Sequence, residues 1–506
     1  MMKDPRLHFS LGFISSLIRN GVPAMLALVV FCLGCQRVEL PQIGNRIDSP
    51  IALASHPRVP VSYVLNASLG GEFETGSLQA FTQGSDGRLN VLSSVKVPRL
   101  GTAVAVAPSG GFLIAGFSGS GARLHVYSLD AQGVPALADK NNQQDLPSGR
   151  VSHVQIVQLP GRSDWVVVVT MADRSFDAQV LVYQFDPVAG FTRRMSAPRD
   201  FYVPDRDNLL GNYTMAWGSP VVFESLGLLV AFPYGSLGYL GINPTALDWL
   251  SGKASSGDTQ YDLRTVSALV VDLNRLLTGS AVESSVGYVP LAFNAEGKKG
   301  DATQASNTKD NESYGFRVSY QSALALDAQG SFCEPNAPLS ALGVHTAVVV
   351  TNTAAADVIA LSGFNLVANQ LRAQLDQNKK QPVLGDLVQS APVSLTQKIP
   401  DLVDSAKGES IPTLVPQMGL IKSGGLCTLA LLRVEQRRSS LGEEKSRIQV
   451  VTAENPAQQL QIESERRGLA AMTINGDSLF AGSFGSNQIL QFKFDGSSLR
   501  SGGVLP

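Results

Sequence analysis

The feature that most constrains this chain is a repeated unit of two apolar strands joined by a glycine-containing turn. Residues 103–116 and 469–482 each hold an apolar strand, such a turn and a second apolar strand ending in Ala-Gly. Four positions match at constant register: Gly110 with Gly476, Leu113 with Leu479, Ala115 with Ala481, and Gly116 with Gly482. Each segment continues into a third strand that ends in Asp, at Asp130 and Asp495, and a further copy ends at Asp186. Self-similarity spread over most of a chain indicates a repeat architecture.

The matched glycines are expected to do two different things. Gly110 and Gly476 fall at tight turns, where glycine adopts a positive φ angle without steric cost. Gly116 and Gly482 end strands, and we expect them to mark close approach to a neighbouring module. In a closed ring the chain ends must also meet. Because residues 469–495 supply about three strands, the region near Tyr63 is expected to complete or adjoin the last module.

Strand period and composition select an all-β fold. Only 16% of the residues are charged, while 48 are Gly and 27 are Pro. This profile is typical of a turn-rich β protein and argues against a coiled coil, a helical array or a disordered scaffold. With four strands per blade in typically 40–50 residues, about 440 residues predict a β-propeller of seven four-stranded blades, with six or eight as alternatives. Polar loop insertions are expected at 294–314 and 368–410, and a tandem of β-sandwiches is the competing fold.

Two tetrapeptides resemble the signature of YVTN-type propellers, including their lactonase-like branch. Tyr63-Val-Leu-Asn66 differs from the family tetrapeptide at one position, and Val349-Val-Thr-Asn352 differs only at the first. The asparagine is expected to hydrogen-bond the local backbone at a turn. Lactonase-like propellers use acid, His and Arg groups near the central channel. None of these maps residue by residue onto this chain, so the resemblance implies the fold and no catalytic residue.

The N-terminal segment has the pattern of an export signal. Basic residues precede an apolar run of thirteen residues, 22–34, which is short for a membrane span of about 20 residues; a short membrane anchor is the alternative. The end of the run, Leu33-Gly34-Cys35-Gln36, resembles the lipobox of bacterial lipoproteins, with Cys32 where that family usually has Leu. The resemblance implies lipidation of Cys35, and Gln36 implies transport to the outer membrane. The expected organisation is a signal peptide at 1–34, a lipidated tether at 35–60 and a propeller domain at 61–506.

The other chemistry-bearing residues are sparse. Cys333 and Cys427 lie in a chain expected to occupy an oxidising compartment, so a disulfide is chemically permitted, with two separate thiols as the alternative. His56, His125, His153 and His345 show no metal-ligand spacing, and no catalytic serine elbow, phosphate loop or dinucleotide motif stands in a suitable context. The sequence therefore predicts no catalytic residue, no metal site and no cofactor.

These observations favour a binding function. A net charge of −2 without a basic stripe argues against nucleic acid as a partner. We expect a membrane-anchored β-propeller lipoprotein that contacts the membrane through its N-terminal lipid and serves as a protein- or glycan-binding scaffold in the bacterial cell envelope. A periplasmic lactonase-type hydrolase and a cell-surface adhesin are the alternatives, and an enzyme is the less favoured class.

Overall fold

The structure is a computed structural model of the whole chain. It describes residues 40–138, 142–173, 178–198, 216–217, 220–231, 233–234, 265–292, 318–325, 344–352, 358–366, 388–389, 398–399, 403–404, 409–410, 413–423, 426–435, 445–451, 459–464 and 468–506.

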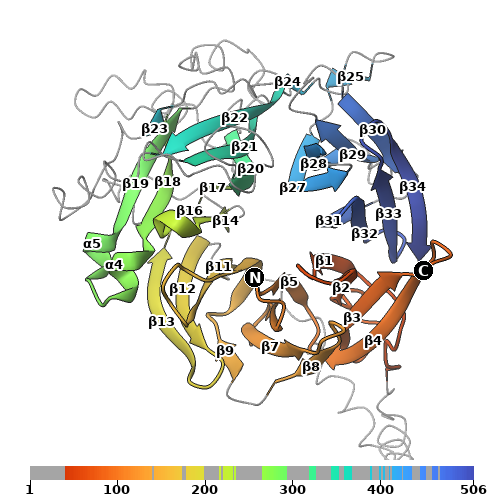
Figure 1. Cartoon of the computed structure of the whole chain (residues 1–506), viewed down its shortest axis with the longest axis horizontal. Helices are drawn as coiled ribbons and strands as arrows, with labels where there is room; N and C mark the ends of the chain where they lie inside the picture. Colours follow the sequence, from red (N-terminus) through yellow and green to blue (C-terminus); the bar gives the residue numbers. More distant parts are fainter. Residues whose placement is uncertain are drawn as a thin grey trace, which may run out of the picture.

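Antiparallel sheets follow one another around a ring in chain order, which makes the protein a β-propeller (Figure 1). Seven of the described sheets have four strands or more, which confirms the predicted seven blades. Blade 1 consists of β1 (Pro50–Ser55), β2 (Val61–Asn66), β3 (Gly76–Gln83) and β4 (Leu89–Val97). Blade 2 consists of β5 (Gly101–Val106), β6 (Phe112–Phe117), β7 (Arg123–Leu129) and β8 (Pro135–Leu137), with β9 (Gln143–Asp145) also paired to β7. Blade 3 consists of β10 (Gly149–Val157), β11 (Trp165–Asp173), β12 (Ala178–Asp186) and β13 (Gly190–Pro198).

The remaining blades follow the same order. Blade 4 consists of β15 (Val221–Phe223), β16 (Leu228–Ala231), β18 (Thr265–Asp272) and β19 (Val286–Ala292). Blade 5 consists of β20 (Val318–Ala325), β21 (Val344–Asn352), β22 (Val358–Leu366) and β23 (Val388–Gln389), with β24 (Lys398–Ile399) also paired to β22. Blade 6 consists of β27 (Thr413–Ser423), β28 (Leu426–Glu435), β29 (Lys445–Val451) and β30 (Gln459–Ser464). Blade 7 consists of β31 (Leu469–Asn475), β32 (Ser478–Ser483), β33 (Gln488–Phe494) and β34 (Leu499–Leu505).

Short elements lie between and within the blades. Two small ladders pair β14 (Ala216–Trp217) with β17 (Pro233–Tyr234) and β25 (Val403–Asp404) with β26 (Glu409–Ser410). Blade 4 also carries the 3-10 turn η4 (Glu224–Leu226) and the helices α4 (Leu273–Leu277) and α5 (Val282–Ser285). Helix α4 begins at the cap Asp272, whose side chain accepts the backbone N–H of Arg275 over 3.1 Å. The buried leucines of α4 pack onto the core shared by blades 3 and 4.

The fold begins earlier than the sequence pattern predicted. Residues 35–60 were expected to form a tether and the domain to start at 61, but β1 lies within this range and is the first strand of blade 1. Ile43 and Ile47 are buried before it, and the Pro41 carbonyl accepts the backbone N–H of Glu74 over 3.2 Å. The tether prediction is therefore wrong from about residue 41 onward. A short first strand with irregular burial lacks the alternation that reveals a half-buried strand.

The ring closes by contact between blade 7 and blade 1. Blade 7 takes all four strands from its own sequence, so the region near Tyr63 adjoins the last blade rather than completing it. Blade 1 residues Ile47, Leu53, Val64, Phe81 and Leu89 form one core cluster with Ala471, Phe480, Ile489 and Leu505 of blade 7. Phe81 and Phe480 meet edge to face with ring centroids 5.3 Å apart. The expected meeting of the chain ends is confirmed.

Both expectations for the matched glycines are confirmed. Gly110 and Gly476 have φ angles of +74° and +64° in the turns between the first and second strands of their blades. A Cβ on Gly116 would lie 2.8 Å from Val151 of blade 3, and a Cβ on Gly482 would lie 2.3 Å from the Pro50 carbonyl oxygen of blade 1. The first pair shapes turns, and the second pair lets adjacent blades approach.

The tetrapeptide Tyr63–Asn66 forms the end of β2 and links blade 1 to its surroundings. The Tyr63 hydroxyl donates to the Gly133 carbonyl of blade 2 over 2.8 Å. Burial first, and then the nearby Asp130 carboxylate, raise the pKa of Tyr63. The Asn66 side chain accepts the backbone N–H of Asp48 over 3.2 Å and donates to Ser77 over 2.9 Å. Asn66 thus fastens the segment leading into β1. The expected bond to local backbone at a turn is not what it makes, because the N–H that it accepts belongs to Asp48, 18 residues earlier.

Candidate functional site

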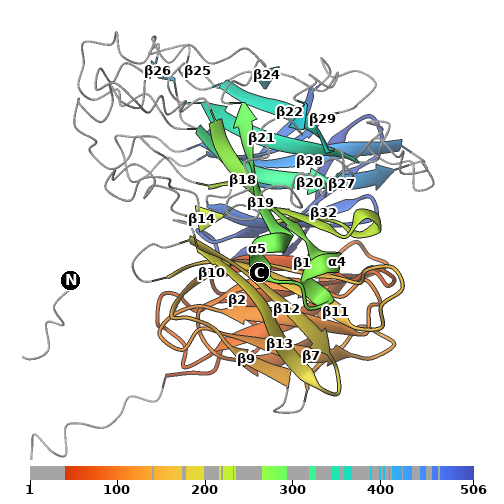
Figure 2. The same ribbon diagram turned by 90° about the vertical axis from the view of Figure 1, so that its left-hand side faces the viewer.

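The strand order divides the connecting segments between two faces of the ring. We call the side with the turns between first and second strands, and between third and fourth strands, the platform face. In blades 1, 2, 3 and 7 its segments are 56–60, 84–88, 107–111, 130–134, 158–164, 187–189, 476–477 and 495–498. The opposite side, the tether face, carries the loops between second and third strands and the connectors that lead into each first strand. In Figure 2 the platform face lies on the right, where β13 begins, and the tether face lies on the left.

The Asp that ends the repeated third strand fixes the turns of the platform face. Asp130 Oδ1 accepts the backbone N–H groups of Gln132 and Val134 over 2.9 and 2.8 Å. The same Asx arrangement recurs in three other described blades, where Asp86 accepts from Arg88, Asp186 from Val188 and Ala189, and Asp495 from Ser497 and Ser498. Such side-chain bonds to the following backbone define a tight turn without help from distant residues. The recurrent Asp is therefore a turn-forming residue.

Asp495 shows the electrostatic consequence of this arrangement. Its carboxylate accepts hydrogen bonds from the hydroxyl and backbone N–H groups of Ser498 and Ser497. These bonds, the Ser498 hydroxyl first, stabilise the ionised form and lower the pKa of Asp495. The turn carries a fixed negative charge at neutral pH.

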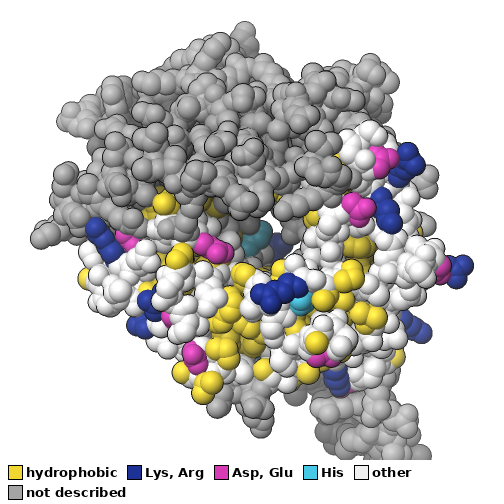
Figure 3. Space-filling model, in the orientation of Figure 1, with side chains coloured by type: hydrophobic (Ala, Val, Ile, Leu, Met, Phe, Trp, Pro, Cys, Tyr) yellow, Lys and Arg dark blue, Asp and Glu magenta, His cyan; other side chains and the backbone are white. Residues whose placement is uncertain are grey.

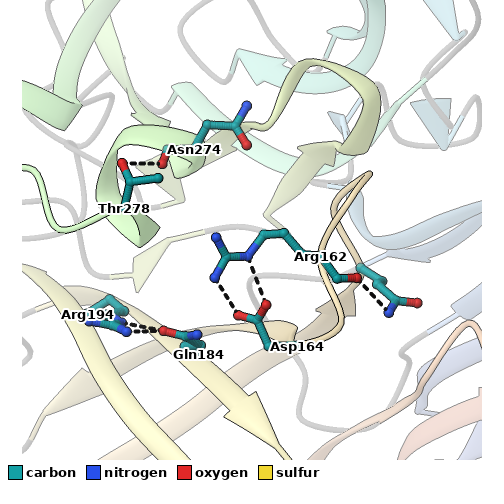
Figure 4. Close-up of polar contacts among 7 residues, drawn as sticks. Arg162, Asp164, Gln184, Arg194, Asn274 and Thr278 are labelled. Atoms are coloured by element: carbon teal, nitrogen blue, oxygen red, sulfur yellow. Dashed lines mark hydrogen bonds and ion pairs between the residues drawn. The ribbon is translucent and has the colours of Figure 1, made fainter.

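A cluster of polar and charged side chains lies on the platform side of blade 3, and Figure 4 shows its contacts. Arg162 and Asp164 form a bidentate pair, with Nε to Oδ1 at 2.9 Å and Nη2 to Oδ2 at 2.8 Å. Nearby, Arg194 donates to the Gln184 side-chain oxygen through Nε over 2.8 Å and also through Nη2. Burial alone would raise the pKa of Asp164, but hydrogen bonds from Arg162, its own backbone N–H and Gln184 lower it on balance. Two guanidinium groups against one carboxylate leave this cluster cationic.

The histidines whose side chains are described have three different surroundings. His56 is buried, with Nδ1 accepting the backbone N–H groups of Arg58 and Val59 and Nε2 3.0 Å from the Gly110 carbonyl oxygen. His125 is 6% exposed and lies against Phe117 and Tyr127, and among the described residues neither ring nitrogen has a hydrogen-bond partner. Burial first, then the Arg123 guanidinium, lower the pKa of His125 to about 4, although Asp145 opposes this.

His153 lies on β10, the first strand of blade 3. Burial, and then the Arg150 guanidinium, lower the pKa of its imidazole to about 4. At neutral pH the imidazoles of His125 and His153 are therefore uncharged.

Figure 3 shows the platform face with a hollow at the ring axis, and basic and acidic side chains distributed around the described blades rather than gathered in one patch.

The residues singled out from the sequence are only partly covered by the described ranges. Cys35 and Cys333 lie outside them, so lipidation and the Cys333–Cys427 disulfide stay predictions. Cys427 lies in β28, paired in register with Lys422 of β27. Within the described ranges no group of three His, Cys, Asp or Glu side chains is placed to hold a metal ion. In the same part of the chain no helix has the length and apolar character that crossing a bilayer requires.

Sequence reasoning missed the Arg162–Asp164 pair and the Arg194–Gln184 contact. The Arg162–Asp164 pair joins two residues that are two positions apart in one turn, and such a spacing is too common in sequences to be singled out. The second joins neighbouring strands, and only the register of β12 against β13 brings its residues together. The recurrent Asp at the end of the third strand was visible as a pattern, and the structure supplies its purpose.

Comparison with known proteins gives similarity to other propellers only at low identity. No protein-family model matches the chain, and no curated protein matches it in sequence. Among solved structures it is similar to Saccharomyces cerevisiae Sqt1, at 13% identity and a TM-score of 0.43, over 90% of this chain and 86% of that one. A putative 6-phosphogluconolactonase from Bacteroides uniformis matches at 12% identity and a TM-score of 0.44, over 85% and 92%. The β-propeller domain of Myceliophteria thermophila Cps50 (Swd1) matches at 9% and 0.46, over 89% and 98%. The β-propeller fold stated above rests on the sheets of this structure.

Proposed function

We propose that this chain is a lipid-anchored β-propeller that serves as a protein- or glycan-binding scaffold in the bacterial cell envelope. The lipobox-like run Leu33–Gln36 supports the anchor, with Cys35 as the lipidated residue. The platform face supports the scaffold, because it presents turns from several blades on one rigid ring.

The single observation that carries the binding function is the self-sufficient geometry of those turns. In four described blades an Asp carboxylate fixes the turn through bonds to the next backbone N–H groups. Side chains such as Val188, which is 90% exposed, are held on a turn that needs no partner to order it. Pre-ordered contact residues lower the entropic cost of binding, the property that a recognition surface requires.

The hydrolase alternative needs a carboxylate beside an imidazole at the channel. The described imidazoles meet backbone groups at His56, a guanidinium near His153, and aromatic rings at His125. The Asp145 carboxylate near His125 lies on β9, which pairs with the third strand β7 of blade 2 rather than with its innermost first strand. These surroundings favour the scaffold. The adhesin alternative differs in which side of the outer membrane the propeller occupies, and protease treatment of whole cells separates the two.

The anchor is tested by a matched pair of cysteine variants in cells fed a labelled fatty acid. Cys35→Ala should lose the acyl label and leave the membrane fraction, because the thiol that would carry the lipid is gone. Cys32→Ala should keep both the label and the membrane fraction. An unlabelled wild-type chain, or a label that survives Cys35→Ala, would refute the anchoring proposal.

The scaffold function is tested by placing a photoreactive amino acid on the platform face of the full-length protein. Illumination of cells carrying it at Val188 should give a discrete adduct with an envelope protein or glycan. The control position is Leu137, an exposed residue of β8 on the outer side of blade 2. Adding Asp186→Ala, which removes the hydrogen bonds that hold the turn, should reduce the adduct from position 188. Equal adducts from 188 and 137, or none from 188, would count against the scaffold.

A further inference from the structure

The tether face of blades 7 and 1 gathers exposed apolar side chains. Among the described residues, Leu40, Leu69 and Phe484 are 38%, 40% and 44% exposed. Leu40 precedes β1, Leu69 lies in the β2–β3 loop, and Phe484 lies in the β32–β33 loop. Single exposed apolar residues are ordinary, but three on the same face of one seam form a candidate interaction surface. We call this group the apolar rim patch.

Hydrogen bonds hold the loops of the apolar rim patch together. The Leu69 backbone N–H donates to Ser49 Oγ over 3.2 Å, and the Ser49 backbone N–H donates to Asn487 Oδ1 over 3.0 Å. Phe484 donates its backbone N–H to the Gly468 carbonyl over 2.8 Å. Ser49 thus joins the loop that carries Leu69 to the loop that carries Phe484. The patch is a fixed surface across the junction of the first and last blades.

The length of chain between Cys35 and the fold limits where an anchor can lie. The described chain begins at Leu40, and the next residue, Pro41, is already bonded to Glu74 in the β2–β3 loop. Four residues separate Cys35 from Leu40, so the chain makes five residue-to-residue steps of at most about 3.6 Å each, or roughly 18 Å when fully extended. A lipid on Cys35 therefore holds the tether face within that distance of the bilayer surface.

We propose that the tether face rests on the membrane, with the apolar rim patch at the boundary between lipid headgroups and acyl chains. The inference rests on the lipidation of Cys35 proposed above. Apolar side chains that enter this boundary gain the free energy of leaving water.

A small patch is enough for contact with the bilayer, because the lipid anchor keeps the patch at a high local concentration near the membrane. Three partly exposed side chains would bind a bilayer weakly if the protein were free. A short tether raises the effective concentration of a second contact to the millimolar range, so a weak contact becomes occupied. The platform face is then turned away from the lipid, toward the partner of the proposed scaffold.

The test uses the full-length lipidated protein in vesicles of phosphatidylethanolamine and phosphatidylglycerol. A photoreactive amino acid replaces Leu69 or Phe484 in the patch, and Val188 on the platform face is the matched exposed control. Positions 69 and 484 should yield phospholipid adducts, and position 188 should yield none. Leu69→Ser should strongly reduce the adduct from a probe at Phe484 while the acyl label is retained.

The outcomes separate the two proposals. An acyl-labelled protein without lipid adducts at 69 and 484, or with equal adducts at 188, would overturn the membrane-facing surface alone. Adducts from 69 and 484 to a protein in cell envelopes, rather than to lipid, would make the patch a protein interface and would also overturn it. A wild-type chain without an acyl label would overturn both proposals.

Discussion

Two seams of the ring hold neighbouring blades by different means. The seam between blades 2 and 3 has a large apolar core, including Phe112 against Trp165 with ring centroids 5.2 Å apart. It also has a backbone bridge, in which Gly119 and Gly149 exchange hydrogen bonds of 2.7 and 3.0 Å. The closing seam between blades 7 and 1 has a smaller apolar cluster and adds polar side-chain pairs. Among these are Ser55 with Thr473 at 2.9 Å and Gln83 with Gln491 at 3.2 Å.

The difference shows what determines the register of blade 7 against blade 1 in a ring whose first and last blades share no strand. Blades 2 and 3 are joined by a short peptide, so their register is largely determined by the chain. No peptide joins blade 7 to blade 1, so side chains must select the register. Directional hydrogen bonds do so, because a shifted blade would leave buried donors and acceptors unpaired.

The largest effect is expected from removing the aromatic side chain at the centre of the closing seam. Phe480→Ala and the matched Phe112→Ala should each lower the free energy of unfolding by about 3–5 kcal/mol, the usual cost of such truncation. Only Phe480→Ala should also separate the urea transition seen by circular dichroism from that seen by tryptophan fluorescence. The reason is that the ring opens at the seam while Trp165 and Trp217, in the blade 3 and 4 region, stay packed. Coincident transitions in both variants would mean that the two seams are equivalent.

The strand-end glycines give a second matched pair. Gly482→Ala should cost about 3 kcal/mol, the upper end for overpacking, because its Cβ would meet a backbone oxygen of Pro50. Gly116→Ala should cost about 1 kcal/mol, because the Val151 side chain that its Cβ meets can shift. Thermal unfolding of the two variants beside wild type measures the difference. A larger loss of thermal stability in Gly116→Ala than in Gly482→Ala would mean that the seam between blades 2 and 3 tolerates an added methyl group less well than the closing seam does.

Acid should weaken the seam between blades 1 and 2 through His125. Because its pKa is lowered to about 4 in the folded state, the unfolded chain, with a pKa near 6.5, takes up a proton that the folded chain resists. The free energy of unfolding should therefore fall as the pH drops from about 6.5 to 4, by up to about 3 kcal/mol. His125→Leu should reduce the slope of this part of the stability–pH curve, leaving the part that His153 contributes, whereas Phe112→Ala should leave the slope unchanged. An unchanged slope in His125→Leu would show that the imidazole does not titrate in this way.

A further small effect is expected at the turn of blade 7. Gly476→Val should cost about 1–2 kcal/mol for entering the left-handed region, since a Cβ there meets nothing within 4 Å. Gly110→Val should cost more, because its Cβ would lie 2.6 Å from the His56 ring. Melting temperatures rank the pair, and equal values would mean that His56 moves aside freely.

The parts of this fold that sequence could predict are those with a local signal. Second and third strands such as β6 and β33 are continuous or alternating apolar runs, and the turn glycines and turn aspartates repeat at constant register. The first strand β1 escaped prediction, because neighbouring blades bury its residues without regard to alternation. Helix α4 escaped because five residues are too few to show a helical period.

The candidate sites divide in the same way. Cys35 has a local motif and could be proposed from the sequence alone. The apolar rim patch could not, because Leu69 and Phe484 are brought to one junction only by ring closure, and neither loop is unusual by itself. Pairs such as Ser49 with Asn487 depend on a register that no short pattern encodes.

The closing seam also determines which contact between blades forms last during folding. Blade 1 is made first, and its surface bearing Leu53, Val64 and Phe81 has its partner in Phe480, some 400 residues later. If the exported chain emerges at the pace of synthesis, about 5–20 residues per second, that surface waits roughly 20–80 seconds for its partner. During this interval the emerging chain carries an uncovered apolar sheet face. The step most exposed to misassembly is thus the last one, when the newest blade must find the oldest.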